Sequence, residues 1–194
     1  MLQELGQQVA AAGWADWLAL LTSVAYVVLA ARGSNWCWGF AAISTAVWAY
    51  QSFVVYRLVS DGLLQVFYFV MAGVGLWRWQ RGPAGEGLAV SSMSWREHGW
   101  VIGGSSVAGV LLGYLFSSTL VAAATYPDAL TTAFSVSTTF LLINRRLENW
   151  LYWVLIDLAY VAIYLSTGAI LFAAMMVINV GVAIMGYWRW RQEL

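Results

Sequence analysis

An aspartate lies in the middle of an apolar, aromatic stretch of the chain. The stretch reads ENWLYWVLIDLAY from Glu148 to Tyr160, and Asp157 is the acid in question. If a helix begins at Asn149, a rise of about 1.5 Å per residue places Asp157 about 12 Å from the helix start. In a helix that crosses a bilayer this depth is close to mid-membrane, where an aspartate costs about 2.5–3.5 kcal/mol on insertion scales. We therefore expect the carboxylate to face a cavity or a partner side chain.

Aromatic side chains share the helical face of this acid. The face carries Trp150, Trp153, Asp157, Tyr160 and Tyr164, at the spacing of residues that lie above one another on a helix. Indole and phenol rings bind flat rings and cations, and a carboxylate adds a preference for positive charge. The alternative is a buried acid that hydrogen-bonds to a Thr, Ser or Tyr of a neighbouring helix. We favour a cavity for a small, flat, cationic or polar heteroaromatic metabolite over a lipid or a bare ion.

Other apolar stretches also carry polar or aromatic side chains at a similar depth. Because such groups are expensive inside a bilayer, we expect four of them to complete the binding site. These four are Trp48, Gln65, Tyr68 and Asn179. Asp61 lies one helical turn before Gln65. It is either a further polar group at this depth or a residue of the outer membrane surface near Arg57. The Ser and Thr residues of 126–144 are expected to bond to their own backbone.

The elements that must position these side chains are membrane-spanning helices. Of the 194 residues, 62% are hydrophobic and 9% are charged, whereas about a quarter of a soluble domain is charged. A run of about 20 apolar residues spans a bilayer core. The sequence predicts seven such spans, at about 14–33, 35–56, 58–80, 99–118, 126–144, 148–168 and 169–190. The predicted fold is an all-α polytopic membrane protein.

Two blocks of the sequence resemble each other. The first begins with NWCWG at Asn35 and ends with GLWRW at Gly75–Trp79; the second begins with NWLYW at Asn149 and ends with GYWRW at Gly186–Trp190. The pattern predicts three helices, a linking helix and three more helices. A single linking helix gives both triplets the same orientation, a parallel repeat as in SWEET transporters. The predicted units are residues 1–80, the cytoplasmic loop and linker helix 81–125, and residues 126–194.

The linker helix and the Trp-Arg-Trp segments each have a structural interpretation. Ser105, Gly109 and Gly113 have the small-xxx-small spacing that permits close helix contact. The alternative is that these glycines are ordinary for a membrane helix. The tryptophans of both Trp-Arg-Trp segments are expected at the membrane interface, with the arginine between them reaching the head groups.

The arginines indicate how the chain is oriented. With seven spans, Arg57 stands alone on one side of the membrane. The other side carries Arg32, Arg78, Arg81, Arg96, Arg145, Arg146, Arg189 and Arg191. Because positively charged loops stay in the cytoplasm, we expect a multi-pass protein of the cytoplasmic (inner) membrane, with its N-terminus outside and its C-terminus in the cytoplasm.

The composition argues against several classes of function. The chain has no lysine, and therefore no Walker lysine for nucleotide hydrolysis. His98 is the only histidine and is expected in the linker loop, which leaves no Ser-His-Asp set and no histidine-rich metal site. A net charge of zero gives no indication of a nucleic-acid partner. We therefore expect neither an enzyme nor a cofactor. The remaining classes are a scaffold protein, a passive carrier, and an ion-coupled carrier with Asp157 as its proton site.

The chain resembles the PnuC-type vitamin transporters. The resemblance rests on N-W-x-x-W-x-x-x-D at Asn149–Asp157, S-D-G-L-L-Q at Ser60–Gln65 and the two Gly-x-Trp-Arg-Trp segments. It implies a duplicated three-helix unit joined by a linker helix, similar to a SWEET with fused halves, and a homotrimer. It also implies facilitated diffusion of a vitamin precursor, with a cytoplasmic kinase that traps the product by phosphorylation.

The resemblance also assigns roles to residues. It implies substrate binding by Gln65, Trp150, Trp153 and Asp157, and the family carries Asn or Asp at the last of these. The familiar member of the family carries nicotinamide riboside, and related branches carry thiamine, riboflavin or deoxynucleosides. Nicotinamide riboside and thiamine are both flat-ringed cations, so the rings and the acid do not separate them. We expect nicotinamide riboside, with thiamine or another B vitamin or nucleoside as the alternative.

Overall fold

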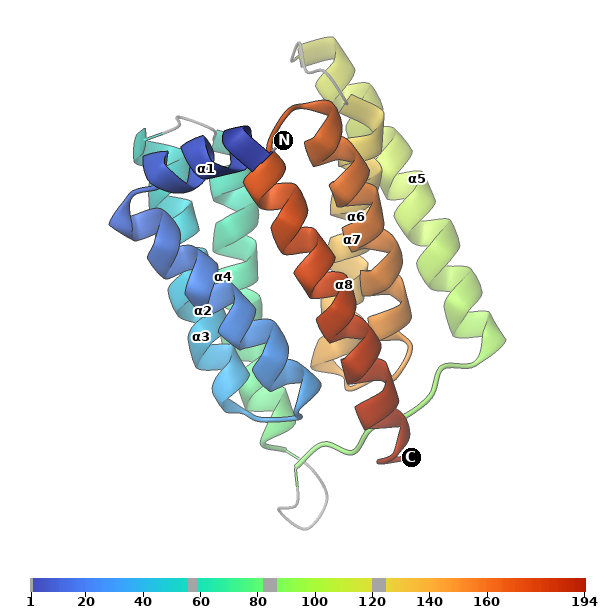
Figure 1. The fold of residues 1–194 in the computed structure, drawn as a ribbon. Helices are drawn as coiled ribbons and strands as arrows, with labels where there is room; N and C mark the ends of the chain where they lie inside the picture. The colour runs from blue at the N-terminus through green and yellow to red at the C-terminus, as the bar shows by residue number, and fades with distance from the viewer. Residues whose placement is uncertain (1, 56–58, 82–86, 120–124) are drawn as a thin grey trace.

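The structure, a computed structural model, describes residues 2–55, 59–81, 87–119 and 125–194. These residues form a bundle of helices (Figure 1). In chain order they are α1 (Leu2–Ala11), α2 (Trp14–Ala31), α3 (Trp36–Tyr50), which continues as the π-helix η1 (Gln51–Val55), α4 (Val59–Trp79), α5 (Trp95–Thr119), α6 (Thr125–Ile143), α7 (Asn149–Ser166) and α8 (Ile170–Arg191). Helix α1 is additional to the predicted spans and lies across the end of the bundle opposite the C-terminus (Figure 1).

Each of the seven predicted spans coincides with one of the helices α2 to α8. In the described part of the chain, α2, α5, α7 and α8 are long and apolar enough to cross a membrane by length and composition alone. Helix α3 is shorter, at 15 residues, and α6 is rich in Ser and Thr. The prediction of an all-helical protein with several membrane spans is confirmed. The finer arrangement, in which a linker helix joins two repeats of three helices, stays a prediction.

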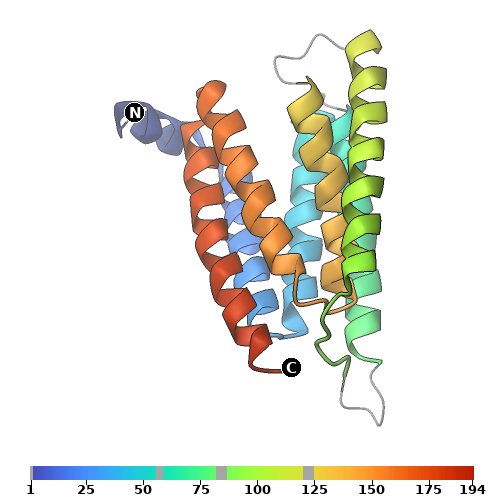
Figure 2. The ribbon, with the colours of Figure 1, turned by 90° about the vertical axis from the view of Figure 1, so that its right-hand side faces the viewer.

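The helices pack as two groups, with α5 at the edge. Helix α3 contacts α2 and α4, helix α7 contacts α6 and α8, and α2 also contacts α8. Helix α5 packs along α6 (Figure 2). The close contact predicted for the small residues of α5 is confirmed, since the Ser105 hydroxyl donates to the Ser137 hydroxyl at 2.7 Å. A Cβ on Gly109 would come within 2.7 Å of Leu130.

The turns after α2 and α6 have the same backbone hydrogen bonds. Such bonds end a helix when the first residue beyond it adopts a left-handed backbone, and that residue is usually glycine. Gly33 fits this rule with a φ of +68°, whereas Arg145 adopts a φ of +49° with a full side chain. After α2, the N–H of Gly33 donates to the Ala30 carbonyl and the N–H of Ser34 donates to the Leu29 carbonyl. After α6, the N–H of Arg145 donates to the Leu142 carbonyl and the N–H of Arg146 donates to the Leu141 carbonyl.

The membrane-interface interpretation of the Trp-Arg-Trp segments is wrong for Trp79 and Trp190. These two side chains are 1% and 0% exposed, whereas Trp77 and Trp188 are 50% and 56% exposed. Sequence alone did not separate the two kinds of position, because tryptophan suits both a packed core and a membrane interface. The second tryptophan of each segment therefore belongs to the core.

The same packing unit occurs once in each group of helices. In each unit a tryptophan ring lies over a glycine and meets the buried tryptophan of the Trp-Arg-Trp segment edge-on. The ring centroids are 5.1 Å and 5.3 Å apart, in the T-shaped geometry that the ring quadrupoles favour. The two units are Trp38 with Gly75 and Trp79, and Trp150 with Gly186 and Trp190.

Hydrogen bonds connect each packing unit to the opposite group of helices. The indole N–H of Trp79 donates to the Leu142 carbonyl in α6, and that of Trp190 donates to the Ala30 carbonyl in α2, both at 3.2 Å. The acceptors are 112 residues apart (142 − 30) and the donors are 111 apart (190 − 79). Two equivalent bonds thus cross between the groups in opposite directions, at the end of the bundle that holds the C-terminus.

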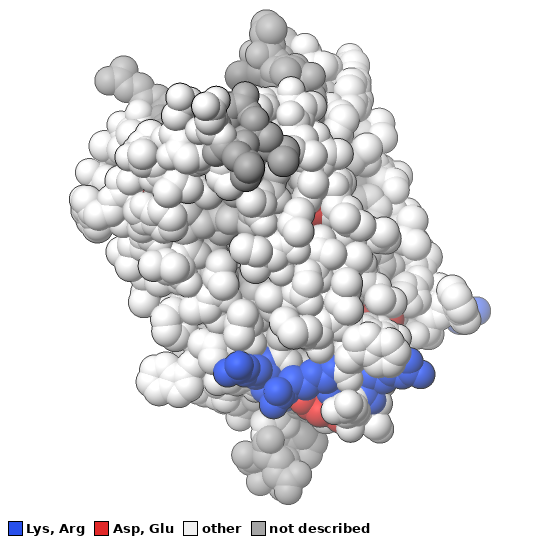
Figure 3. Space-filling model, viewed as in Figure 1, with Lys and Arg blue, Asp and Glu red and all other residues white. Residues whose placement is uncertain are grey.

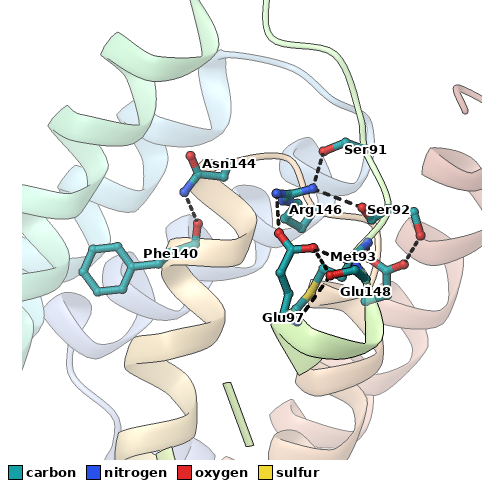
Figure 4. Close-up of polar contacts among 9 residues, drawn as sticks. Ser91, Ser92, Met93, Glu97, Phe140, Asn144, Arg146 and Glu148 are labelled. Atoms are coloured by element: carbon teal, nitrogen blue, oxygen red, sulfur yellow. Dashed lines mark hydrogen bonds and ion pairs between the residues drawn. The ribbon is translucent and has the colours of Figure 1, made fainter. Parts of the chain in front are cut away.

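The segment before α5 is attached to the turn between α6 and α7 (Figure 4). The carboxylate of Glu148 accepts hydrogen bonds from the Ser92 hydroxyl and from the Met93 N–H. Arg146 donates to the Glu97 carboxylate at 2.6 Å and to the Ser92 carbonyl at 3.0 Å. Hydrogen bonds of this kind, with a charged partner, are among the stronger ones in proteins. They tie the start of the linker helix to α6 and α7.

His98 lies in the first turn of α5, so the prediction that placed it in a loop is wrong. The helix begins at Trp95 because Ser94 and Glu97 cap it reciprocally, each side chain accepting the other residue's backbone N–H. The Nδ1 atom of His98 is 2.8 Å from the hydroxyl of Tyr152 in α7. The only histidine therefore joins two helices.

Arginines gather at the end of the bundle that holds the C-terminus (Figure 3). Six exposed arginines are Arg32, Arg78, Arg81, Arg96, Arg189 and Arg191. Arg57, the single arginine expected on the other side, and the linker residue Pro83 lie outside the described residues.

Replacing Gly186 by Ala is expected to lower the unfolding temperature of the purified protein in detergent. The new methyl group would come within 2.7 Å of the Trp150 ring, and overpacking of this kind costs about 1–3 kcal/mol. Gly181→Ala in the same helix is the control, because nothing lies within 4 Å of its Cβ position. Alanine should there stabilise the helix by about 0.5–1 kcal/mol. Equal unfolding temperatures for the two variants would show that the packing unit does not need its glycine.

Candidate functional site

A cavity of about 680 Å³ lies between the group α2–α4 and the group α6–α8. Each of these six helices contributes to its wall, and among the described residues α1 and α5 contribute none. The volume falls in the range of about 300–1,000 Å³ that small-molecule sites occupy. Helical periodicity builds the wall, since lining residues recur every three or four positions along one face of each helix. In α4 this face is Asp61, Leu64, Gln65, Tyr68, Met71 and Ala72.

All eight predicted site residues line this cavity. Trp48 comes from α3, two residues from α4, four from α7 and one from α8. The other seven are Gln65, Tyr68, Trp150, Trp153, Asp157, Tyr160 and Asn179. Gln51, which follows Trp48 by three positions, does not line the cavity; its side chain donates a hydrogen bond to the Asp16 carboxylate at 2.8 Å. The structure thus gathers the predicted residues around one space.

Asp157 is buried, with 6% of its surface exposed, and it borders the cavity. No hydrogen bond or ion pair connects its carboxylate to any described residue. The alternative considered for this acid, a hydrogen bond to Thr, Ser or Tyr of a neighbouring helix, is therefore not observed there. A buried, ionised carboxylate without a partner is strongly unfavourable unless something in the cavity compensates its charge or it takes up a proton. The site is suited to a cation or to a ligand that donates hydrogen bonds.

A second acid borders the cavity nearer the end that carries α1. Asp61 accepts a hydrogen bond from the Ser52 hydroxyl, and both residues line the cavity. Ser52 lies in the π-helix η1, a geometry that is frequent at functional sites. The carboxylate of Asp61 thus has a protein partner, in contrast to that of Asp157.

Aromatic rings cover the same end of the cavity. Tyr160 stacks on Tyr164 with ring centroids 5.7 Å apart, and Tyr164 contacts Phe172 at 5.6 Å. Phe172 in turn contacts Trp48 at 5.9 Å. This last contact joins α8 to α3, so the aromatic cover bridges the two groups of helices.

Two tryptophans close the opposite end, toward the arginines. Trp38 and Trp150 line the cavity yet are only 2% and 1% exposed. Neither indole N–H has a hydrogen-bond partner among the described residues. Trp150 therefore forms part of a floor packed on Trp190, while Trp153, one turn further along α7, lies in the side wall.

Some lining residues were not predicted. Tyr26 lies three positions after Ser23 on the cavity face of α2, and a search for aromatic residues beside small polar ones would have found it. Ser52 depends on the local π-turn, which changes the face that η1 presents. The expectation that Ser and Thr of residues 126–144 bond to their own backbone is confirmed for Thr131 and Thr139, which donate to carbonyls of their own helix. It is wrong for Thr138, whose buried hydroxyl has no hydrogen-bond partner among the described residues.

Comparison with known families identifies the chain. A sequence model described as nicotinamide mononucleotide transporter matches residues 13–192. The chain belongs to the nicotinamide mononucleotide transporter family. The match includes α2 to α8 and every residue of the candidate site. A search of curated protein sequences finds no match.

A solved structure shares the fold of this family member. The crystal structure of the vitamin B3 transporter PnuC superposes with a TM-score of 0.74, over 98% of this chain and 88% of that chain, at 22% sequence identity. At this identity the comparison establishes the fold alone. The resemblance expected from the sequence motifs is therefore confirmed, and the family is one of membrane transporters, which fits the expectation that the protein is not an enzyme.

Proposed function

We propose that this transporter is a facilitator that imports nicotinamide riboside across the cytoplasmic membrane. The observation that carries the proposal is the carboxylate of Asp157, which is buried at the cavity without a partner among the described residues. A pyridinium ring is flat and positively charged, so it would compensate this carboxylate and stack on aromatic walls.

The charge of the cavity favours the riboside over the mononucleotide. Asp61 and Asp157 line the cavity, and none of its described lining residues is Arg, Lys or His. A phosphate group would meet two carboxylates and no positive side chain, which is unfavourable in a low-dielectric site. The same charge supports metabolic trapping, because phosphorylation by a cytoplasmic kinase would convert the substrate into a form that the cavity disfavours.

Each predicted site residue has a role in this proposal. Asp157 supplies the negative field, and Trp153 and Trp150 provide aromatic surface for the ring. The amides of Gln65 and Asn179 and the phenols of Tyr68 and Tyr160 would bind the carboxamide and the ribose hydroxyls. Trp48 belongs to the aromatic cover at the α1 end.

The proposed architecture is a parallel repeat of three helices, a linker helix and three helices. The two equivalent packing units and their crosswise hydrogen bonds support it. Tyr68 and Asn179 support it as well. They are 111 residues apart (179 − 68), the same distance as between Trp79 and Trp190, and both line the cavity. The proposed units are 1–80, 81–125 and 126–194. In such repeats, transport follows from rocking of the two triplets about a site between them.

The proposed mechanism is passive. Binding energy alone equalises concentrations across the membrane, so net uptake would depend on the cytoplasmic kinase. Assembly as a homotrimer is proposed from the family resemblance. Thiamine, another flat-ringed cation, is the second candidate substrate, and proton coupling through Asp157 is the second candidate mechanism. The binding and vesicle experiments described below distinguish these possibilities.

A reporter fused after Leu194 is expected to report from the cytoplasm. Arginines gather at the C-terminal end of the bundle (Figure 3), and positive residues stay on the cytoplasmic side. A fluorescent-protein fusion should therefore be bright and a phosphatase fusion inactive. Activity of the phosphatase fusion alone would reverse the proposed orientation.

Asp157→Asn is expected to weaken binding of nicotinamide riboside by about ten- to a hundredfold, the range of a hydrogen bond to a charged group. Reduced nicotinamide riboside has the same shape without the ring charge, and its affinity should change little. Asp61→Asn is the matched control, because Asp61 already has a partner in Ser52, and it should lose less affinity. Calorimetry on the purified variants, with thiamine and riboflavin as competing ligands, measures all of these. Equal losses for the charged and the neutral riboside would contradict charge recognition.

Vesicles that contain only the purified protein, with the membrane potential held at zero, are expected to take up nicotinamide riboside until the inner and outer concentrations are equal. A proton or sodium gradient should leave this end point unchanged, and an added kinase with ATP inside should raise total uptake. Accumulation of free riboside above the external concentration under a proton gradient, lost in Asp157→Asn, would establish coupled transport instead.

A further inference from the structure

Three layers of side chains close the cavity at its arginine-rich end. Trp38 and Trp150 line the cavity, and Trp79 and Trp190, which do not line it, pack beneath them. The rings of Trp79 and Trp190 are 5.8 Å apart and belong to opposite groups of helices. Arg145 lies over both rings, with its guanidinium carbon 5.0 Å and 5.1 Å from their centroids. The arginine therefore covers the seam between the two groups.

Further bonds hold the Arg145 side chain in this position. Its Nη2 forms an ion pair with the Glu193 carboxylate at 3.0 Å, and its Nη1 donates to the Leu88 carbonyl at 2.8 Å. Leu88 follows α4, whereas Glu193 follows α8, so the arginine bonds to segments from both sides of the seam. Partial burial lowers the pKa of Arg145, and the Glu193 carboxylate opposes this shift. With an exposed fraction of 13%, the side chain is shielded, which strengthens its contacts with the rings.

Arg145 also occupies a backbone conformation that disfavours a side chain. Its φ of +49° is the one positive φ among the described residues other than glycine, and the equivalent turn of the first group has Gly33 at φ +68°. A left-handed conformation costs a residue other than glycine about 1 kcal/mol or more, and such strain concentrates at functional and switching positions. The two turns thus differ at this position, where Arg145 replaces a glycine and its side chain contacts both groups of helices.

We propose that Arg145 is the latch of a gate formed by Trp38, Trp79, Trp150 and Trp190, which must open to release substrate into the cytoplasm. The proposal rests on the proposed transport function. When the two groups separate at this end, the indole bonds to Ala30 and Leu142 break together with the contacts between Arg145 and Trp79. Two contacts of Arg145 cross the seam, the cation–π contact with Trp79 and the hydrogen bond to the Leu88 carbonyl. The ion pair with Glu193 lies within the α6–α8 group and holds the arginine in position.

Cys37 reports on the gate without any engineered label. It is the only cysteine of the chain, and it is fully buried in the same cluster as Trp79 and Trp190. Arg145→Ala is expected to raise the rate at which a water-soluble maleimide modifies Cys37 in the purified protein by about tenfold, since an ion pair and two cation–π contacts are lost. Glu193→Gln removes only the ion pair and should raise the rate less.

Two further variants separate gate opening from damage to the fold. Arg145→Gly relieves the backbone strain, so it should raise the maleimide rate while unfolding at a temperature equal to or above that of Arg145→Ala. Arg191→Ala removes a cation–π contact of 5.4 Å with Trp188, which lies on the exposed surface, and should leave the rate unchanged. Wild-type rates in both Arg145 variants, or an equal increase in Arg191→Ala, would overturn the latch. The assay needs no substrate, so a failure to bind nicotinamide riboside would refute the proposed function and leave this result intact.

Discussion

An ionised carboxylate inside a membrane has to be compensated or else take up a proton, and Asp157 has no charged or hydrogen-bonding protein partner among the described residues. Direct packing of the two helix groups around it would bury an unpaired charge at a cost of several kcal/mol. The cavity of about 680 Å³ removes this conflict, because it leaves room for a cation or for water beside the acid. In α2–α4 and α6–α8, the residues that line the cavity recur every three or four positions, so they form one face of each helix. Their lining combines aromatic rings, amides and hydroxyls.

The two ends of the cavity are closed by different means. At the α1 end, the groups meet through the tilted contact of Trp48 with Phe172. Gln8 of α1 adds hydrogen bonds to the turn between α7 and α8, at the Gly168 carbonyl and the Leu171 N–H. At the other end, four packed tryptophans, two indole hydrogen bonds and an arginine close the seam. A firmer closure toward the arginine-rich end is what the proposed rocking mechanism needs in order to release substrate to one side at a time.

Sequence patterns predicted the parts of this protein that depend on local periodicity. Helical spacing placed Asp157, Trp153 and Tyr160 on one face, and apolar length located α2 to α8. Features that depend on contacts between distant segments were not predicted. Trp79 and Trp190 are core residues because Gly75 and Gly186 admit the neighbouring rings, and a Trp-Arg-Trp segment has the same composition in either setting. The left-handed Arg145 was not predicted either, since its conformation depends on rings and carbonyls up to 66 residues away (145 − 79).

The most direct test of this account is an experimental structure of the protein in lipid with nicotinamide riboside bound. The account predicts the pyridinium ring in the cavity between the two helix groups, within about 6 Å of the Trp153 ring and in contact with the Asp157 carboxylate. The ribose should lie toward the amides of Gln65 and Asn179. Substrate bound outside this cavity, or a cavity collapsed so that Asp157 bonds to a protein group, would contradict the central claim that an unpaired acid creates the binding site.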